Sequence, residues 1–224
     1  KKIIQKASEC QVLTVFDACQ SIVHKRHDVQ QLQCDFLVFS AHKLYGPTGL
    51  GILYLNEPML KLLKPTRFGG GMVSDVQKFD SQYLDGPMKF EAGTPNIAAV
   101  IAFAKVLDFL EQLGLDKIFE YEKSLGNYLQ TSLSELSGFR VLGGLGTPRS
   151  LYSLDFDAVH SHDVAYGLGL NNVCVRAGQH CTNPLHASLN SRASLRVSIG
   201  MYNTKEDVDI FVSELKNVLS FFKK

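Results

Sequence analysis

The sequence has no long apolar segment, almost no net charge and no closely spaced pair of cysteines. None of its 224 residues belongs to an apolar run near the roughly 20 residues that a membrane-spanning helix needs. Lys and Arg number 23 and Asp and Glu 22, and the resulting net charge of +1 does not point to a nucleic acid or a membrane surface as partner. With 45% hydrophobic and 20% charged residues, the composition is typical of a globular protein.

The cysteines argue against a disulfide framework and against a structural zinc site. There are five, an odd number, and no two have the Cys-x-x-Cys spacing of a metal-binding pair. We therefore expect free thiols and a reducing, cytoplasmic environment. The five are Cys10, Cys19, Cys34, Cys174 and Cys181.

The first half of the sequence predicts a mixed or parallel sheet with helices. The opening residues KKIIQKASEC read as the end of a helix that leads into a strand. Short apolar runs then have the length of strands buried on both faces, and they lie at 12–16, 34–40 and 49–55. A short helix is predicted at 58–64, and a longer one runs from Pro95, in its first turn, to Gly114. Between these helices, 68–75 reads as a glycine-rich loop and 76–90 as polar and irregular.

The second half predicts a small α/β domain, because strands and helices alternate along it. An amphipathic helix is expected at 115–136 and another helix at 162–170. The chain ends in an amphipathic helix at 205–224, for which Thr204 is a suitable N-cap. Short strands are expected within 139–144, 150–157, 172–178 and 192–204.

Two polar residues follow predicted strands in a way that indicates cofactor chemistry. Lys43 comes after the second apolar run and before a glycine-rich turn, and an amine in such a place can form a Schiff base if it is partly desolvated. Asp17 ends the first run, where a carboxylate can pair with a pyridinium nitrogen and strengthen the ring as an electron sink. A surface lysine and a helix cap are the alternatives for each residue alone, but the pair favours a cofactor site.

Several motifs occur in order from Val12 to the last helix. They are D-A-C-Q, S-A-H-K-L-Y-G-P-T-G, F-E-A-G-T-P-N, R-A-G-Q-H-C and R-V-S-I-G-M-Y-N. In them the sequence resembles the cysteine desulfurases of the class V aminotransferase family. The resemblance implies an α/β fold of the pyridoxal-phosphate-dependent transferases, the aspartate aminotransferase-like fold type I. Residues 1–112 would be the C-terminal part of the large cofactor-binding domain, and 113–224 the small C-terminal domain with the catalytic cysteine loop.

The resemblance also implies a pyridoxal 5'-phosphate site. Asp17 would hold the pyridinium nitrogen and Gln20 the phenolic oxygen, while Lys43 would form the Schiff base. Ser40 and His42 would bind the phosphate. Thr94 would reach the phosphate of a neighbouring subunit's cofactor, which implies a homodimer.

The resemblance assigns the reaction to residues near the C-terminus. Arg196 would bind the substrate carboxylate through two parallel hydrogen bonds, and Arg176 would line the mouth of the site. Cys181 would take the sulfur of L-cysteine as a persulfide while L-alanine leaves, and nearby His180 and Arg176 would favour the thiolate through their charge. An ordinary free cysteine, a surface ion pair and a loop arginine are the alternatives for Cys181, Arg196 and Arg176.

The short R-x-G-x-H-C loop resembles the sulfur-mobilisation (SufS-like) subgroup. Its members supply sulfur for iron–sulfur cluster assembly and pass it to a small acceptor protein of the SufE or SufU kind. Two departures stand out: Gln179 replaces a histidine usual in that loop, and 68–75 is slightly compressed. The family's polypeptide is also about twice as long, so we expect roughly its first half elsewhere. A selenocysteine lyase, another class V enzyme such as an epimerase, and an inactive fragment remain as alternatives; no metal is expected.

Overall fold

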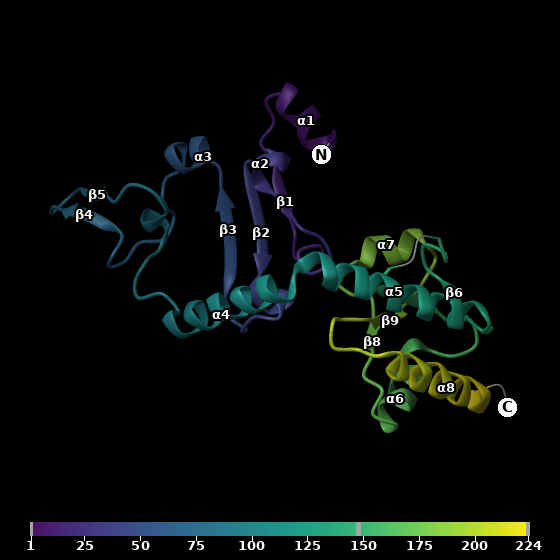
Figure 1. Ribbon diagram of the computed structural model, residues 1–224. Coiled ribbons are helices and arrows are strands. Elements are labelled where there is room, and N and C mark those ends of the chain that lie inside the picture. The colour runs from purple at the N-terminus through teal and green to yellow at the C-terminus, as the bar shows by residue number, and fades with distance from the viewer. Residues whose placement is uncertain (1, 147–148, 223–224) are drawn as a thin grey trace. The chain divides into compact units, whose positions relative to one another are not determined.

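The computed structural model describes residues 2–146 and 149–222 and divides into two compact units, Lys1–Leu115 and Asp116–Lys224 (Figure 1). The sequence places the boundary at 112/113, and the assignment of the two parts to a large and a small enzyme domain stays a prediction. The last two residues of the expected C-terminal helix lie outside the described residues. Within these residues, no helix is both long and apolar enough to cross a membrane.

A three-stranded mixed sheet forms the centre of the first unit (Figure 1). Strand β1 (Val15–Asp17) runs parallel to β2 (Phe36–Ser40), and β2 pairs antiparallel with β3 (Gly51–Leu55). Each strand begins two or three residues later than the apolar run that predicts it. The mixed sheet itself is as expected from the sequence.

The burial of this sheet differs from the prediction. The apolar runs predict strands buried on both faces, yet Val15 is 68% and Leu53 54% exposed. The other face is covered, since Leu37 is buried in a cluster with Ile4 and Cys34. Among the described residues nothing covers the exposed side chains, so the prediction of two buried faces is wrong for this chain.

Asparagines at the N-caps set where two helices of the first unit begin. Oδ1 of Asn56 accepts the N–H of Met59, and Oδ1 of Asn96 accepts that of Ala99. Pro95 therefore precedes the cap and does not lie in the first turn, which corrects the sequence prediction. The α-helices of this unit are α1 (Lys2–Glu9), α2 (Val29–Leu32), α3 (Glu57–Leu62) and α4 (Ile97–Leu113), and two 3₁₀ helices are η1 (Ala41–Leu44) and η2 (Pro87–Phe90).

The segment predicted to be irregular contains a β-hairpin. Strands β4 (Val73–Val76) and β5 (Ser81–Tyr83) pair antiparallel, and the N–H of Gln77 donates to O of Asp80 across the turn. The register shifts at Val73/Asp75, and this irregularity, together with the polar composition, hides the alternation that marks a strand. The prediction of an irregular 76–90 segment is thus wrong for β5.

The second unit is a four-stranded antiparallel sheet with helices packed on it (Figure 1). The strand order is β6-β7-β9-β8, formed by β6 (Arg140–Val141), β7 (Leu151–Asp155), β9 (Ser194–Ser198) and β8 (Arg176–Gly178). The helices are α5 (Leu115–Ser134), α6 (Ser161–Leu170), α7 (Asn183–Ser188) and α8 (Lys205–Phe222). Apart from α7, each of these elements lies in a segment where the sequence predicts it.

The core of the second unit lies between this sheet and the long helices. Leu129 of α5, Leu154 of β7, Leu195 of β9 and Leu215 of α8 are all fully buried in one cluster. Together such side chains stabilise the unit, since each buried leucine contributes roughly 1.5–3 kcal/mol relative to exposure.

Thr204 caps α8, as the sequence predicts. Its hydroxyl accepts the N–H of Asp207 at 3.3 Å, and its own N–H donates to the Asp207 carboxylate at 2.9 Å. This reciprocal pair satisfies two otherwise free N–H groups at the start of the helix.

Candidate functional site

One group of candidate residues lies where β1 and β2 end. The two strands are parallel, so their C-terminal ends share one edge of the sheet. Asp17 is the last residue of β1 and Ser40 the last of β2, and His42 and Lys43 follow at once in η1. Four residues that the sequence singles out are thus brought together.

Asp17 is held as a carboxylate. The N–H of Cys19 donates to its Oδ1 at 2.9 Å, and this bond is the main reason why the pKa of Asp17 lies below its usual value. The positive charge of Lys43 lowers the pKa further, while slight burial opposes both. An exposed aspartate that stays ionised is suited to pair with a positively charged ring nitrogen.

The position of Lys43 depends on a tight turn packed against α4. Tyr45 closes η1 in the left-handed conformation with φ of 59°, and the N–H of Gly46 donates to O of Ala41 at 2.9 Å. Gly46 lies against Phe103 of α4 with no room for a side chain. Helix α4 therefore acts as a support for the turn that carries Lys43.

The structure places the other two cofactor candidates on exposed turns. Gln20 lies in the turn that follows β1, and Thr94 lies in the turn before α4. That second turn rests on the glycine-rich loop, where the N–H of Gly93 donates to O of Gly70 at 2.8 Å. It also adjoins the loop after Lys43, because a Cβ on Gly49 would lie 3.8 Å from Nδ2 of Asn96.

A second group of candidate residues lies on neighbouring strands of the other unit. Arg176 opens β8 and Arg196 is the central residue of β9, and the two are direct partners in the antiparallel register. Cys181 follows β8 in a short turn and is exposed. The three residues assigned to substrate and sulfur chemistry are therefore close neighbours in one unit.

The backbone of the Cys181 turn is unusual. His180 and Cys181 both adopt positive φ, at 52° and 64°, a region that costs a residue with a side chain roughly 1–2 kcal/mol. The N–H of Thr182 donates to O of Gln179 at 2.8 Å, and Nε2 of Gln179 donates to O of Arg192 at 3.2 Å. These bonds hold Cys181 on a strained but anchored turn.

Arg196 has an unfilled hydrogen-bond donor. Its Nε is buried, and no partner for it occurs among the described residues. Burial lowers the pKa of Arg196, the charge of Arg176 lowers it further, and the Cys181 thiolate raises it. Buried guanidinium donors normally find acceptors, so this Nε–H is available to an acceptor outside the described residues; the carboxylate role that the resemblance implies for Arg196 stays a prediction.

His180 is not the cation that the sequence analysis expects beside Cys181. Burial is the largest influence and lowers its pKa, and the charges of Arg196 and Arg176 add to this effect, although a hydrogen bond to the backbone of Ser194 opposes it. The ring is therefore neutral near pH 7, because its ordinary pKa is already about 6.5. The positive charge near Cys181 comes from Arg176 and Arg196.

The turn after Cys181 has polar neighbours that sequence reasoning misses. His186 of α7 is 4% exposed, and its ring lies 5.8 Å from that of His180. Ser194 of β9 is fully buried and contacts both rings. Ser194 reaches the turn because β9 pairs with β8, which no spacing in the sequence reveals. His186 lies in α7 only four residues after Thr182, but α7 is not predicted from the sequence.

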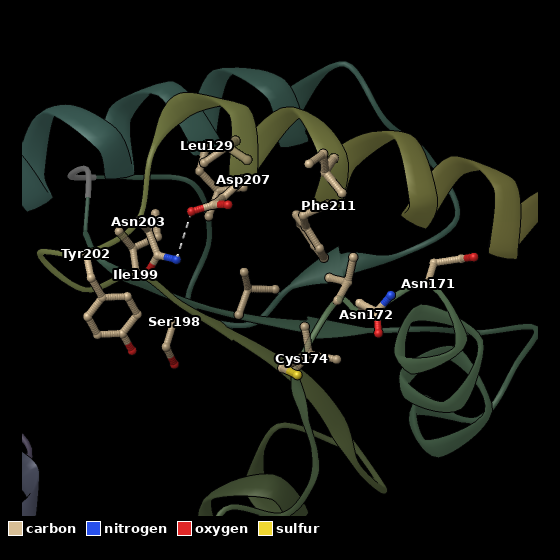
Figure 2. Close-up of a pocket in the computed structure, with 15 residues that line it drawn as sticks. Leu129, Asn171, Asn172, Cys174, Ser198, Ile199, Tyr202, Asn203, Asp207 and Phe211 are labelled. Carbon is tan, nitrogen blue, oxygen red and sulfur yellow. Dashed lines mark hydrogen bonds between the residues drawn. The ribbon is translucent and has the colours of Figure 1, made fainter.

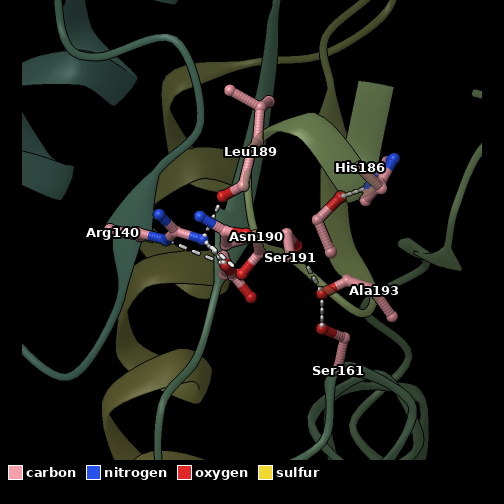
Figure 3. A network of polar contacts seen from close by, with 9 residues as sticks. Arg140, Ser161, His186, Leu189, Asn190, Ser191 and Ala193 are labelled. Carbon is pink, nitrogen blue, oxygen red and sulfur yellow. Dashed lines mark hydrogen bonds and ion pairs between the residues drawn. The ribbon is translucent and has the colours of Figure 1, made fainter. Parts of the chain in front are cut away.

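A further network fixes the chain between α7 and β9 (Figure 3). Nη2 of Arg140 donates to the Asp155 carboxylate at 2.7 Å and to the backbone oxygens of Leu189 and Asn190. Ser161 Oγ donates to O of Ala193 at 3.0 Å. The strand that carries Arg196 is thereby positioned from both sides.

A cavity of about 420 Å³ in the second unit is separate from these residues (Figure 2). It lies between α8 and the far ends of β8 and β9, and neither Cys181 nor the two arginines line it. Across its rim, Asn203 donates to the Asp207 carboxylate at 3.3 Å. Among the described residues, no group of histidine, cysteine, aspartate or glutamate side chains is arranged to hold a metal ion.

The residues at the ends of β1 and β2 have the chemical groups that pyridoxal phosphate requires. An ionised carboxylate, a hydroxyl, an imidazole and a primary amine lie at one sheet edge, as residues Asp17, Ser40, His42 and Lys43. The described residues therefore fit the cofactor that the sequence resemblance implies.

Comparison with known proteins agrees with this arrangement. Residues 1–211 match the family model described as aminotransferase class-V. A probable cysteine desulfurase from Halalkalibacterium halodurans is 41% identical over 222 residues, which cover 99% of this chain and 54% of the relative. One from Pseudomonas putida is 42% identical over 211 residues, with 94% and 52% covered. The chain spans about half the length of the curated relatives it matches.

Solved structures give the same result. The crystal structure of the cysteine desulfurase CsdA from Escherichia coli matches with a TM-score of 0.93 and 37% identity, over 98% of this chain and 54% of that one. The apo cysteine desulfurase from Thermococcus onnurineus matches with a TM-score of 0.92 and 32% identity, over 98% and 56%. These matches confirm the expected aminotransferase-type α/β fold, and together with the family model they establish that the chain belongs to the aminotransferase class-V family.

Proposed function

We propose that this chain is part of a pyridoxal-phosphate-dependent cysteine desulfurase that converts L-cysteine to L-alanine and keeps the sulfur on Cys181. The observation that carries the proposal is the pairing of Arg176 with Arg196 beside the Cys181 turn, with the Nε–H of Arg196 buried and free. A carboxylate-binding arginine next to an exposed thiol suits an amino acid whose side chain is the sulfur donor. The printed names of the relatives support the same reaction.

The residues of the first unit would hold the cofactor. Lys43 would bind its carbonyl carbon, and Asp17, whose pKa is lowered, would face the ring nitrogen. Ser40 and His42 would bind the phosphate, and Gln20 the phenolic oxygen. Bound pyridoxal phosphate supplies an electron sink for the carbon skeleton of the substrate.

The remaining steps belong to the side chains of the protein. Arg196 would fix the substrate carboxylate, and the Lys43 amine would take the proton from the substrate Cα. The Cys181 thiolate attacks the substrate sulfur, so that an S–S bond forms and the C–S bond breaks, with its electron pair staying on carbon. That carbon gains a proton and leaves as part of alanine, so one thiol and one cysteine become one persulfide and one alanine without an added oxidant.

The assembly and cellular role extend this proposal. We place Thr94 at the cofactor phosphate of a second subunit, as in a homodimer, since it lies exposed on a separate turn. The persulfide would pass to a small sulfur-acceptor protein and supply iron–sulfur cluster assembly. The five cysteines are free, which supports a reducing cytoplasm.

The test is persulfide formation on Cys181 in the full-length protein with pyridoxal phosphate and L-cysteine. Trypsin cleaves after Arg176 and Arg192, and the peptide 177–192 contains Cys181 as its only cysteine. Mass spectrometry should find this peptide heavier by one sulfur atom, with alanine released in equal amount.

Two variants serve as controls. Cys181→Ser should retain the visible cofactor absorbance and lose alanine production, whereas Lys43→Ala should lose both. Persulfide formation that proceeds at a cysteine other than Cys181 would refute its role. Selenide release from selenocysteine without sulfur transfer from cysteine would favour a selenocysteine lyase instead.

A further inference from the structure

A chain of hydrogen bonds surrounds the Cys181 turn. Oγ1 of Thr182 donates to O of Gln179 at 2.7 Å, and it also lies 3.1 Å from Nδ1 of His186. Nε2 of His186 lies 3.0 Å from Oγ of Ser194. The same Oγ lies 3.1 Å from Nε2 of His180, so the chain begins and ends on residues that flank the nucleophile.

The proton positions at the Thr182 end follow from what each atom can accept. The hydroxyl of Thr182 donates its hydrogen to the backbone oxygen of Gln179. Toward His186, the Thr182 hydroxyl oxygen can therefore only accept a hydrogen bond. The other neighbour of His186 Nδ1 is the carbonyl oxygen of Thr182 at 3.2 Å, which is also an acceptor. Nδ1 of His186 therefore carries a hydrogen, and when the ring carries only this one, its Nε2 accepts the hydroxyl hydrogen of Ser194.

The proton positions at the His180 end of this hydrogen-bond chain are consistent with those at the Thr182 end. Nε2 of His180 lies 3.1 Å from the carbonyl oxygen of Ser194, an acceptor only, so this nitrogen carries the hydrogen. It can share that hydrogen with Oγ of Ser194, whose own hydrogen is directed to His186. Nδ1 of His180 then has a free lone pair, and this buried atom has no partner among the described residues.

We propose that Thr182, His186 and Ser194 are positioning residues for Cys181, and that they hold His180 and His186 in opposite neutral tautomers. The proposal rests on the proposed function, in which Cys181 accepts the substrate sulfur. The chain of hydrogen bonds connects the two residues on either side of Cys181, and it thereby maintains the strained φ angles of His180 and Cys181. It gives the nucleophile a fixed place without using a group that touches substrate.

The charges around His180 explain why a neutral ring is required. Arg196, Arg176 and His186 are the charged or titratable groups that act on it. A proton on His180 would add a further buried positive charge beside the carboxylate-binding Arg196. A proton on His186 would direct two N–H groups at the single hydroxyl of Ser194 and break the chain.

The direct test is the tautomeric state of the two rings in the full-length protein. Ring-¹⁵N histidine is incorporated, and long-range proton–nitrogen correlation spectra are assigned by comparison with His180→Gln and His186→Gln. We expect His180 in the Nε2–H form and His186 in the Nδ1–H form at pH 7. The same tautomer in both rings, or a protonated ring in either, would overturn the proposal.

A second measurement tests the positioning itself. The rate at which iodoacetamide alkylates Cys181 is followed in the peptide 177–192. Loss of one hydrogen bond of about 1 kcal/mol corresponds to roughly a fivefold change, so Thr182→Val should raise the alkylation rate by about that factor. Thr182→Ser should restore the wild-type rate and its pH profile. The matched control is Ser188→Ala, an exposed serine at the C-terminal end of α7, the helix that Thr182 precedes.

The outcomes separate this proposal from the proposed function. Equal alkylation rates in Thr182→Val and Thr182→Ser would refute the positioning role even if the enzyme were active. Opposite tautomers and a hydroxyl-dependent rate would support it even if no sulfur were transferred, and only the proposed function would then fail. A variant that does not fold is recognised by its circular dichroism, and the tautomer measurement on the wild-type protein still decides.

Discussion

Gly46 lies directly against Phe103, and this contact fixes the turn of Lys43 on helix α4. A Cβ at position 46 would lie 2.5 Å from Cδ2 of Phe103 and 2.9 Å from O of Ala41. The carbonyl oxygen cannot move away freely, because it accepts the N–H of Gly46. A side chain at this position must therefore displace the ring, the turn, or both.

We expect Gly46→Ala to destabilise the protein by roughly 1–3 kcal/mol, because it overpacks a buried contact. The melting temperature should fall, and Phe103→Leu in the same chain should recover part of the loss by removing the obstructing ring atoms. Gly70→Ala is the matched control, since a Cβ at position 70 would meet nothing within 4 Å. Equal melting temperatures for the two single variants would contradict the packing argument.

Asp35 should make the stability of the first unit sensitive to acid. Burial raises its pKa, but hydrogen bonds from the N–H and hydroxyl of Thr14 and from Asn56 outweigh burial, so its pKa in the folded protein is lowered. A carboxylate whose pKa is lowered by folding stabilises the fold at pH values above its pKa in the unfolded chain, which is about 3.9. This stability is lost as the pH falls through the lower folded value.

The measurement is urea unfolding between pH 6 and pH 2. The wild-type protein should lose stability below about pH 4, and Asp35→Asn should be less stable at pH 6 and lose less on acidification. Glu57→Gln, at an exposed ion pair with Lys61, should resemble the wild-type protein. A parallel pH dependence for Asp35→Asn and the wild-type protein would count against the prediction.

His180 should produce a second pH dependence, at higher pH. Burial, the first cause, lowers its pKa in the folded protein, while the unfolded chain binds a proton at about pH 6.5. The stability it contributes is complete above that value and declines as the pH falls from about 6.5 toward the folded pKa.

Thermal unfolding between pH 8 and pH 5 checks this. The decline in melting temperature should be smaller for His180→Gln, which cannot take up the proton. His27 has a lowered pKa as well, mainly through burial, so His27→Gln is required to separate the two contributions. An unchanged decline in His180→Gln would show that its ring is not the source.

Arg196→Lys should weaken substrate binding while the cofactor site stays intact. A lysine keeps the positive charge but loses the two-pronged bond to a carboxylate, and a hydrogen bond between charged groups is worth roughly 1.5–3 kcal/mol. We expect KM for L-cysteine to rise by about tenfold or more, with the Lys43-dependent absorbance unchanged. A KM equal to that of the wild-type enzyme would exclude Arg196 from the carboxylate site.

The sequence predicts those parts of the fold that local patterns control. The ends of β1 and β2 come from apolar runs followed by polar residues, so the amino-acid pattern alone is enough to place Asp17, Ser40 and Lys43 at one edge of the sheet. The capping box of Thr204 with Asp207 is likewise local. Such features depend on neighbours a few residues apart, which is why they can be read directly.

Features that depend on distant pairing could not be predicted. The β4–β5 hairpin has a register shift and polar strands, and its pairing rather than its composition makes it regular. Ser194 and His186 meet at the Cys181 turn only because β9 lies beside β8 and α7 folds back on them. The neutral state of His180 also depends on burial, which its position in the sequence does not reveal.

The left-handed backbone at Cys181 has a consequence for protein engineering. With φ of 64°, position 181 is one where glycine is conformationally preferred over cysteine. A library screened for heat resistance alone would therefore be expected to enrich Cys181→Gly, and with it the loss of the thiol. Under the proposed function, thermostabilisation of this protein must accordingly be coupled to a selection for sulfur transfer, because a gain in stability at this position removes the thiol that accepts the sulfur.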